Sequence, residues 1–270
     1  MTVDLPADFA DWLALREPAD AAARAADLAD AVRHRVTGGP LTVHDLGSGT
    51  GSMARWLAPL LPGPQHWILH DQDADLLARA AAAVPGAAAD GAPVTVTTRR
   101  GDLTRLTAAD LADADLVTAS ALLDMLTAEE VDRLVAACAG RRTLFALSVT
   151  GRVALTPADP LDAEVAAAFN AHQRRRVGGR TLLGPDAADA AAAAFARHGV
   201  DVLTRPSPWR LGPEQAALAT AWFTGWLAAA REQRPDLAEA TRAYADRRRA
   251  ELAAGELRVL VDHRDLLAGG

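Results

Sequence analysis

Three aspartates follow runs of apolar residues that are typical of buried strands. Asp45 ends the run at 42–46, Asp71 follows the run at 66–70, and Asp102 comes shortly after 94–98. Between the first two lies a turn with glycine at positions 47, 49 and 51, and then a helical segment that begins at Ser52. Glycine lets the backbone turn sharply and leaves room for a ligand against main-chain N–H groups. A strand, a glycine turn, a helix, a second strand and an acid in this order indicate a nucleoside-binding half-fold.

The spacing of the glycines distinguishes between two classes of nucleoside ligand. Dinucleotide-binding proteins use the pattern G-x-G-x-x-G, whose third glycine allows close packing of the helix on the strand. In this chain that third position is Ser52. The carboxylate of Asp45 would also oppose a pyrophosphate, whereas it suits a cation. The pattern therefore favours S-adenosylmethionine, which carries a sulfonium and an ammonium and no phosphate, over a nicotinamide dinucleotide.

Alternating strands and helices must position these residues. The apolar runs predict seven strands, at 42–46, 66–70, 94–98, 115–119, 143–149, 200–204 and 256–262. Helices between the first five strands predict a doubly wound parallel sheet. Residues 7–36 are expected to form two helices divided at Pro18 that cover the ligand, because proline cannot donate the helical hydrogen bond. A hairpin or lid is expected at 176–183 and one helix at 237–254.

Residues 45–51, Asp-Leu-Gly-Ser-Gly-Thr-Gly, resemble the glycine motif of class I S-adenosylmethionine-dependent methyltransferases. The resemblance covers residues 43–149 and includes Asp71, Asp102 and the segment after the fourth strand. It implies a Rossmann-like α/β fold, with a doubly wound, seven-stranded, mostly parallel sheet whose last strand is antiparallel. Helical N-terminal and C-terminal cap elements would flank this sheet. The apolar residues 259–261 agree with the antiparallel last strand.

The same resemblance implies which residues hold the cofactor. The glycine turn would pass beneath its methionine portion, Asp45 would orient the ammonium, and Asp71 would accept both ribose hydroxyls. Asp102 would accept the adenine amine. The full set of expected cofactor-binding residues is Asp45, Gly47, Ser48, Gly49, Gly51, Asp71, Gln72, Asp102, Leu103, Ser120 and Ala121. S-adenosyl-L-homocysteine would be the product.

The acceptor and the general base are less constrained by the sequence. Methyl transfer is an in-line displacement, for which a protein aligns the nucleophile, removes a proton where required and excludes water. Asp124, after the fourth strand, and His172, in an alanine-rich helix, are the candidate bases, whereas His263 is expected to be structural. The candidate substrate-binding residues are Arg24, Arg176, Trp209 and Trp222, with Arg16 as a further arginine near the ligand. Aromatic residues with arginines would suit a small, planar or acidic metabolite.

Composition limits the partners that this chain can have. Its 270 residues carry a net charge of −7, which argues against a nucleic-acid surface. One cysteine excludes an internal disulfide and a multi-cysteine zinc site, and no Asp, Glu or His cluster has metal-ligand spacing, so metal-independent transfer is expected. No apolar run approaches the roughly 20 residues that span a bilayer, so we expect a cytoplasmic protein. We also expect either a monomer or a homodimer.

The sequence predicts a single domain over residues 1–270. Within it, residues 1–40 would form the N-terminal helical cap, 41–150 the cofactor-binding core, and 151–270 the rest of the sheet with substrate-specificity insertions. Two other functions stay open at this point. One is an NAD(P)-dependent oxidoreductase, and the other is a non-catalytic protein that binds S-adenosylmethionine.

Overall fold

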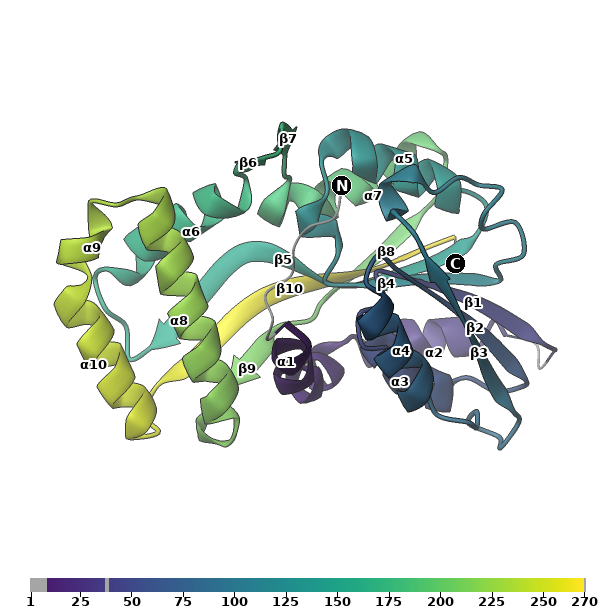
Figure 1. The fold of residues 1–270 in the computed structure, drawn as a ribbon, viewed down its shortest axis with the longest axis horizontal. Coiled ribbons are helices and arrows are strands. Elements are labelled where there is room, and N and C mark those ends of the chain that lie inside the picture. Colours follow the sequence, from purple (N-terminus) through teal and green to yellow (C-terminus); the bar gives the residue numbers. More distant parts are fainter. Residues whose placement is uncertain (1–8, 37–38, 270) are drawn as a thin grey trace.

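The computed structural model describes residues 9–36 and 39–269, and within them a mixed sheet forms the centre of the molecule (Figure 1). Seven strands lie in the order β3-β2-β1-β4-β5-β10-β8, and β9 pairs with β10 beside them. They are β1 (Leu41–Leu46), β2 (Gln65–Asp71), β3 (Val94–Arg100), β4 (Leu116–Ser120), β5 (Arg142–Thr156), β8 (Val202–Pro206), β9 (Trp209–Leu211) and β10 (Arg258–Ala268). β1 to β5 pair in parallel, and β10 is antiparallel to β5, β8 and β9. The predicted α/β fold with an antiparallel last strand is confirmed.

Helices cover both faces of the sheet, which explains why β1, β2 and β4 are buried along almost their whole length. On one face, α5 (Ala128–Cys138) and α7 (Ala187–Arg197) pack through a cluster that includes Leu134 and Phe195. On the other, α2 (Ala26–Arg33), α3 (Ser52–Leu57) and α4 (Ala74–Ala83) pack around Trp67. Figure 1 shows these two layers above and below the strands. The parallel strands therefore direct their carboxyl ends to one edge between the layers.

Two helix starts follow from the local sequence as expected. Asp73 accepts hydrogen bonds from the N–H groups of Asp75 and Leu76 and so caps α4. Thr127 and Glu130 form a capping box at the start of α5, in which each side chain bonds the backbone of the other residue. Both caps satisfy N–H groups that have no partner in the first helical turn.

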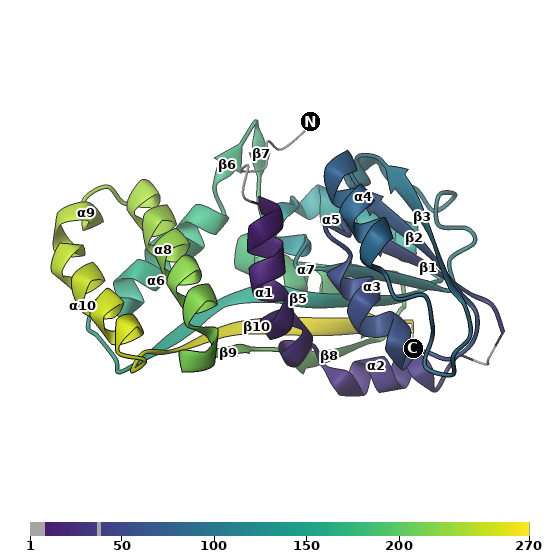
Figure 2. The same ribbon diagram turned by 60° about the horizontal axis from the view of Figure 1, so that its bottom comes forward.

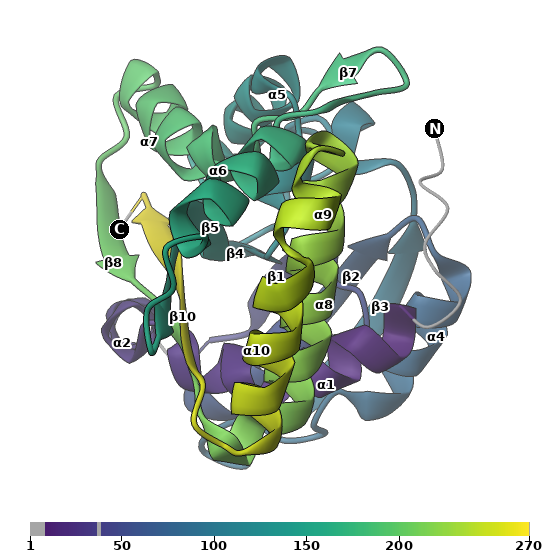
Figure 3. The ribbon, with the colours of Figure 1, turned by 90° about the vertical axis from the view of Figure 1, so that its left-hand side faces the viewer.

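β5 and β10 extend beyond the other strands and carry a second helical layer (Figures 1 and 3). This layer contains α6 (Asp162–Gln173), α8 (Ala216–Gln233), α9 (Leu237–Ala240) and α10 (Arg242–Ala253). An apolar cluster with Trp226, Phe223 and Tyr244 at its centre joins these helices to β9 and β10. The hairpin of β6 (Arg176–Val177) and β7 (Arg180–Thr181), predicted as a hairpin or lid, follows α6.

The predicted division of the N-terminal helices at Pro18 is wrong. Helix α1 (Phe9–Ala23) runs through Pro18, and α2 starts only after an extended residue, Ala25. The helices separate at Ala25 because its N–H donates to a residue distant in the sequence, Asp265 on β10, whose Oδ2 lies at 2.8 Å. Helix α1 lies between α3 and α8 and packs on β9 (Figure 2).

Other boundaries also differ from the sequence prediction. The single helix predicted at 237–254 is two helices, α9 and α10, which meet at Thr241. β5 extends past the predicted end at 149 to Thr156, and β10 extends past 262 to Ala268. The two strands pair with each other along this extra length, which places His263 inside the sheet. Across the described ranges, no helix is long and apolar enough to cross a membrane.

Candidate active site

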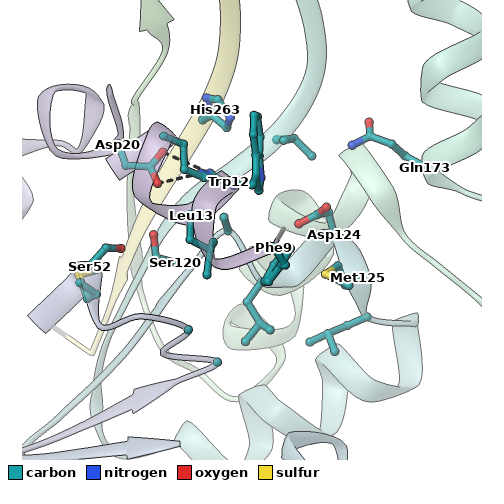
Figure 4. Close-up of a pocket in the computed structure, with 18 of the residues that line it drawn as sticks. Phe9, Trp12, Leu13, Asp20, Ser52, Ser120, Asp124, Met125, Gln173 and His263 are labelled. Carbon is teal, nitrogen blue, oxygen red and sulfur yellow. Dashed lines mark hydrogen bonds and ion pairs between the residues drawn. The ribbon is translucent and has the colours of Figure 1, made fainter. Parts of the chain in front are cut away.

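A cavity of about 490 Å³ opens at the carboxyl ends of β1, β2 and β4. The glycine turn and the acids after the strands form one side of it, and α6, α8, β9 and β10 form the other. Helix α1 crosses between the two sides and lines the cavity through Phe9, Trp12, Leu13, Arg16 and Asp20. In Figure 4, Trp12, Leu13 and Phe9 lie between Ser52 and Ser120 on one side and Asp124 and Gln173 on the other.

The glycine turn has the conformation that its sequence predicts. Gly47, Gly49 and Gly51 have φ values of 63°, 53° and 86°, in the left-handed region that favours glycine. A Cβ on Gly51 would lie 3.1 Å from the Cβ of Ala80 in α4, so this glycine lets the turn approach that helix closely. Gly47, Ser48 and Gly49 line the cavity, whereas Gly51 lies behind it.

Asp45 is an almost fully buried carboxylate in the wall of the cavity. It is 1% exposed, and its Oδ1 accepts a hydrogen bond from Thr118 Oγ1 at 2.7 Å. Its Oδ2 is buried and has no hydrogen-bond partner among the described residues. Burial raises the pKa of Asp45 to about 7, although the Thr118 hydrogen bond and the charge of Arg24 oppose this rise. An ammonium group at Oδ2 would supply the missing partner, so the site fits the cationic end of S-adenosylmethionine.

Asp71 uses both carboxylate oxygens to fix the neighbouring backbone. Oδ2 accepts from the Gly49 N–H at 2.9 Å, and Oδ1 accepts from the Asp73 N–H at 3.0 Å. An ionised carboxylate has about four lone-pair sites, so acceptor capacity is left for two ribose hydroxyls. Gln72 lines the cavity beside it.

Asp102 and Leu103 lie at the far end of the same side. Asp102 caps the one-turn helix η2 (Leu103–Arg105), where its Oδ1 accepts from the Thr104 N–H and Oγ1 at 3.0 and 2.7 Å. These hydrogen bonds lower the pKa of Asp102. Both Asp102 and Leu103 line the cavity.

Ser120 and Ala121 form the floor between the two sides of the cavity. Ala121 has a φ of 50°, which turns the chain away from β4. The Ser120 Oγ accepts from Arg24 Nη2 at 3.0 Å, and the same nitrogen donates to Ser52 Oγ at 3.0 Å. Arg24 is 4% exposed and does not line the cavity. It therefore joins α1 to the glycine turn and β4 from behind, instead of facing a substrate as the sequence suggested.

Asp124 faces the part of the cavity beyond this floor (Figure 4). Burial raises its pKa to about 6, and the charges of Arg16 and Arg175 oppose the rise. His263 also lines this part, with 4% of its surface exposed, and burial lowers its pKa to about 3. At neutral pH Asp124 is therefore mainly a carboxylate, and His263 is an uncharged imidazole.

The remaining candidates divide into two groups. Trp209 and Trp222 line the cavity, as do Phe169, Asn170 and Gln173 of α6. Phe9 and Trp12 also line it, although the sequence did not indicate them as site residues. His172 and Arg176 do not line it: His172 lies 3.3 Å from Glu232, and Arg176 is exposed on the hairpin. The lining residues of α1 recur every three to four positions and therefore share one face of the helix: Phe9, Trp12, Leu13, Arg16 and Asp20. The sequence contains this pattern, but it does not show that α1 covers the cavity.

Among residues 9–36 and 39–269, no group of three or more His, Cys, Asp or Glu side chains could hold a metal ion.

Comparisons with known proteins match one segment of this chain to a known domain. Residues 43–142 match a family model described as a methyltransferase domain. No curated protein sequence matches the chain significantly. Among solved structures, loganic acid methyltransferase with S-adenosylhomocysteine is similar over 94% of this chain and 93% of its own, with 10% identity and a TM-score of 0.50, which shows a shared fold. A methyltransferase from Geobacter sulfurreducens, in complex with S-adenosylhomocysteine, is 18% identical over 99% of this chain and 98% of its own, with a TM-score of 0.44.

The fold and the family match together indicate a methyltransferase. Residues 43–142 match a methyltransferase domain, and this segment spans the glycine turn, Asp71, Asp102 and Asp124. A methyltransferase domain uses S-adenosylmethionine as its cofactor, which argues against the nicotinamide alternative. The match to an enzyme domain also argues against a non-catalytic role.

Proposed function

We propose that this methyltransferase transfers the methyl group to an oxygen or nitrogen of a small metabolite, without a metal ion. The observation that carries the proposal is one continuous cavity of about 490 Å³ that runs from the glycine turn to Asp124 beneath α1. A cavity of this size, covered by a helix, fits a small molecule. The net charge of −7 further supports a small molecule over a nucleic acid.

The cofactor would lie along the side of the cavity that the acids form. Asp45 would hold its ammonium, Asp71 its ribose hydroxyls, and Asp102 its adenine amine, with Gln72 and Leu103 beside the base. Gly47, Ser48 and Gly49 leave room for the methionine portion, and Gly51 holds the turn against α4. When bound, S-adenosylmethionine supplies a methyl carbon already activated by the sulfonium.

The residues of the chain then have three tasks. Ser120 and Ala121 define the floor on which donor and acceptor meet. Asp124 removes the proton of the acceptor, because it faces the cavity and its raised pKa of about 6 lies close to neutral pH. Helix α1 covers the cavity and excludes water from the displacement.

Calorimetric titration and a methylation assay test this function. Binding of S-adenosylmethionine and S-adenosylhomocysteine is expected, and no binding of NAD⁺ or NADP⁺. Incubation with a library of hydroxyl- and amino-bearing metabolites is then expected to release S-adenosylhomocysteine at an unchanged rate in the presence of EDTA. Activity on RNA or protein alone, or activity lost with EDTA and restored by Mg²⁺, would contradict the proposal.

A further inference from the structure

Every arginine that lines the cavity within the described residues already has an acidic partner. Arg16 pairs with Asp20 through two hydrogen bonds of 2.9 and 3.2 Å, and Arg180 pairs with Glu130 through bonds of 2.9 and 2.5 Å. Arg152, which is largely exposed, lies 3.4 Å from Asp262. A carboxylate or phosphate on the acceptor would have to displace one of these acids.

The Arg16 pair is the most firmly held of the three. Its guanidinium lies 4.9 Å from the ring centre of Trp209 and 5.9 Å from that of Trp12. The indole Nε1 of Trp209 also donates to Asp20 Oδ1 at 2.9 Å, and Asp20 is 4% exposed. Arg16, Asp20 and Trp209 thus form a neutral unit with its charges satisfied, and not a free cation for a substrate.

Asp124 has the opposite character. No side chain among residues 9–36 and 39–269 donates a hydrogen bond to its carboxylate, although it lines the cavity. Within the described residues, the Asp124 carboxylate therefore has no direct ion-pair partner, although the charges of Arg16 and Arg175 act on it from a distance. Such a group attracts an O–H or N–H donor and repels an anion.

Aromatic rings form the walls around this carboxylate. Trp12, Trp209, Trp222 and Phe169 all line the cavity. Trp222 is held by stacking on Trp226, at 5.2 Å between ring centres and 20° between planes, and Trp209 is held by Asp20. Fixed aromatic walls favour a flat, apolar ring between them.

Two further polar atoms at this end lack partners. Gln173 Oε1 and His263 Nδ1 are buried and make no hydrogen bond within the described part of the chain. Both residues line the cavity. Buried polar atoms without partners are costly, so polar groups on the ring edge, or water, would pair with them in the complex.

We infer that the methyl acceptor is a flat aromatic or heteroaromatic ring that carries a hydroxyl or amino group and no carboxylate or phosphate, with Asp124 as the base. This inference deepens the proposed function and rests on it. In the reaction, the O–H or N–H bond breaks and its electron pair forms the new bond to the methyl carbon. The bond from sulfur to that carbon breaks, its electron pair stays on sulfur, and the proton moves to the Asp124 carboxylate. The aromatic residues and arginines of the sequence allowed an acidic acceptor, whereas the site favours an uncharged ring.

Two matched probes test the inference: 2-naphthol and 6-hydroxy-2-naphthoic acid, which differ by one carboxylate. Each is titrated calorimetrically at pH 8 into protein saturated with S-adenosylhomocysteine. The uncharged ring is expected to bind at least about tenfold more tightly than the carboxylated ring. In Asp124→Asn this preference should fall to about threefold or less, because the repelling charge is gone.

Asp246→Asn is the matched control, since it makes the same chemical change at an exposed residue of α10 away from the cavity. It should keep the full preference of the wild-type protein. Equal or tighter binding of the carboxylated ring, binding of neither ring, or an unchanged preference in Asp124→Asn would overturn the inference. Failure of S-adenosylhomocysteine to bind in the loading step would instead overturn the proposed cofactor site, so the two failures are distinct.

Discussion

At the scale of single residues, Asp45 shows how a ligand site shapes the stability of the protein without its ligand. Burial raises the pKa of this carboxyl group from 3.8 to about 7. Between these two pH values the folded protein therefore binds a proton that the unfolded chain has released. The stability contributed by Asp45 is complete below pH 3.8 and is lost as the pH rises through about 7.

Asp45→Asn is expected to separate stability from cofactor binding. At pH 8 and without cofactor, the variant should melt a few degrees higher than the wild type, because it no longer buries an unpaired charge. Its affinity for S-adenosylmethionine should fall by about tenfold or more, because the ammonium loses its anionic partner. Calorimetric melting and titration at pH 5 and pH 8 check both effects.

The difference in melting temperature should shrink at pH 5, where the wild-type carboxyl group is protonated. A variant that is less stable than the wild type at pH 8, or that binds the cofactor equally well, would contradict this role of Asp45.

Asp124 is expected to set the pH dependence of turnover. A base must be unprotonated, so kcat with an acceptor found in the metabolite screen should rise with pH around about 6 and level off above it. The charges that act on Asp124 are those of Arg16 in α1 and Arg175 after α6. In Asp124→Asn, kcat should fall by about 100-fold and the inflection should disappear.

The other candidate base from the sequence provides the comparison. His172 lies outside the cavity lining, so His172→Gln should keep the inflection of the wild type. Loss of the inflection in His172→Gln, with its retention in Asp124→Asn, would reverse the assignment.

At the scale of elements, α1 connects the cofactor side of the cavity to the acceptor side. Its Leu13 lies against the glycine turn, where a Cβ on Gly49 would lie 3.1 Å from Leu13 Cδ1. Its Glu17 accepts two hydrogen bonds from Arg55 of α3, at 2.6 and 2.5 Å. Arg16 and Asp20 hold its other face to Trp209. Both substrates would therefore be covered by a single helix.

Glu17→Gln is expected to weaken this cover while leaving every cavity residue in place. The ion pair with Arg55 is partly buried, so its loss should cost about 1 kcal/mol and raise the Kd for S-adenosylmethionine by about fivefold, mainly through faster dissociation. Stopped-flow dissociation measures the effect. Asp132→Asn, which removes an exposed pair between α5 and Arg197, should not change the dissociation rate, and a similar increase in both variants would count against a covering role of α1.

At the scale of the whole molecule, Asp265 joins segments from both ends of the described chain. Its Oδ2 accepts from the Ala25 N–H at 2.8 Å, and its Oδ1 accepts from the Leu147 N–H at 2.7 Å and from Ser207 Oγ at 2.5 Å. Burial raises the pKa of this carboxyl group, and the three hydrogen bonds oppose that rise. The N-terminal helices, β5 and the segment before β9 are thus positioned by one side chain of β10.

Asp265→Ala is expected to destabilise the protein by about 3 kcal/mol, because it leaves buried donors without an acceptor. For a chain of this size the melting temperature should fall by about 6 to 12 °C. Ser207→Ala removes only one of the three donors and should lower it by much less. Equal effects of the two substitutions in thermal melting would show that Asp265 does not act as a shared acceptor.

The sequence predicted the features that local rules determine and missed those that distant contacts determine. The glycine turn, the cap at Asp73 and the capping box at Thr127 each depend on a few consecutive residues, and all three were predicted correctly. The end of α1 depends on Asp265, which is 240 positions from Ala25, so no local rule could have moved the break away from Pro18. Arg16 and Arg24 look alike in the sequence, and only the packing of α1 places one in the cavity and the other behind it.

The position of β10 in the sheet also constrains how the protein is made. Residues 258–268 come last among the described elements, yet β10 lies between β5 and β8 and supplies His263 to the cavity wall. During translation, β1 to β5 emerge early and can pair with one another, whereas β8 has no neighbour until β10 leaves the ribosome. The nascent chain therefore exposes the free edges of β5 and β8 until residues 258–268 have been made. A ribosome that stalls before residue 258 would leave a half-built sheet with an open edge that is prone to aggregate.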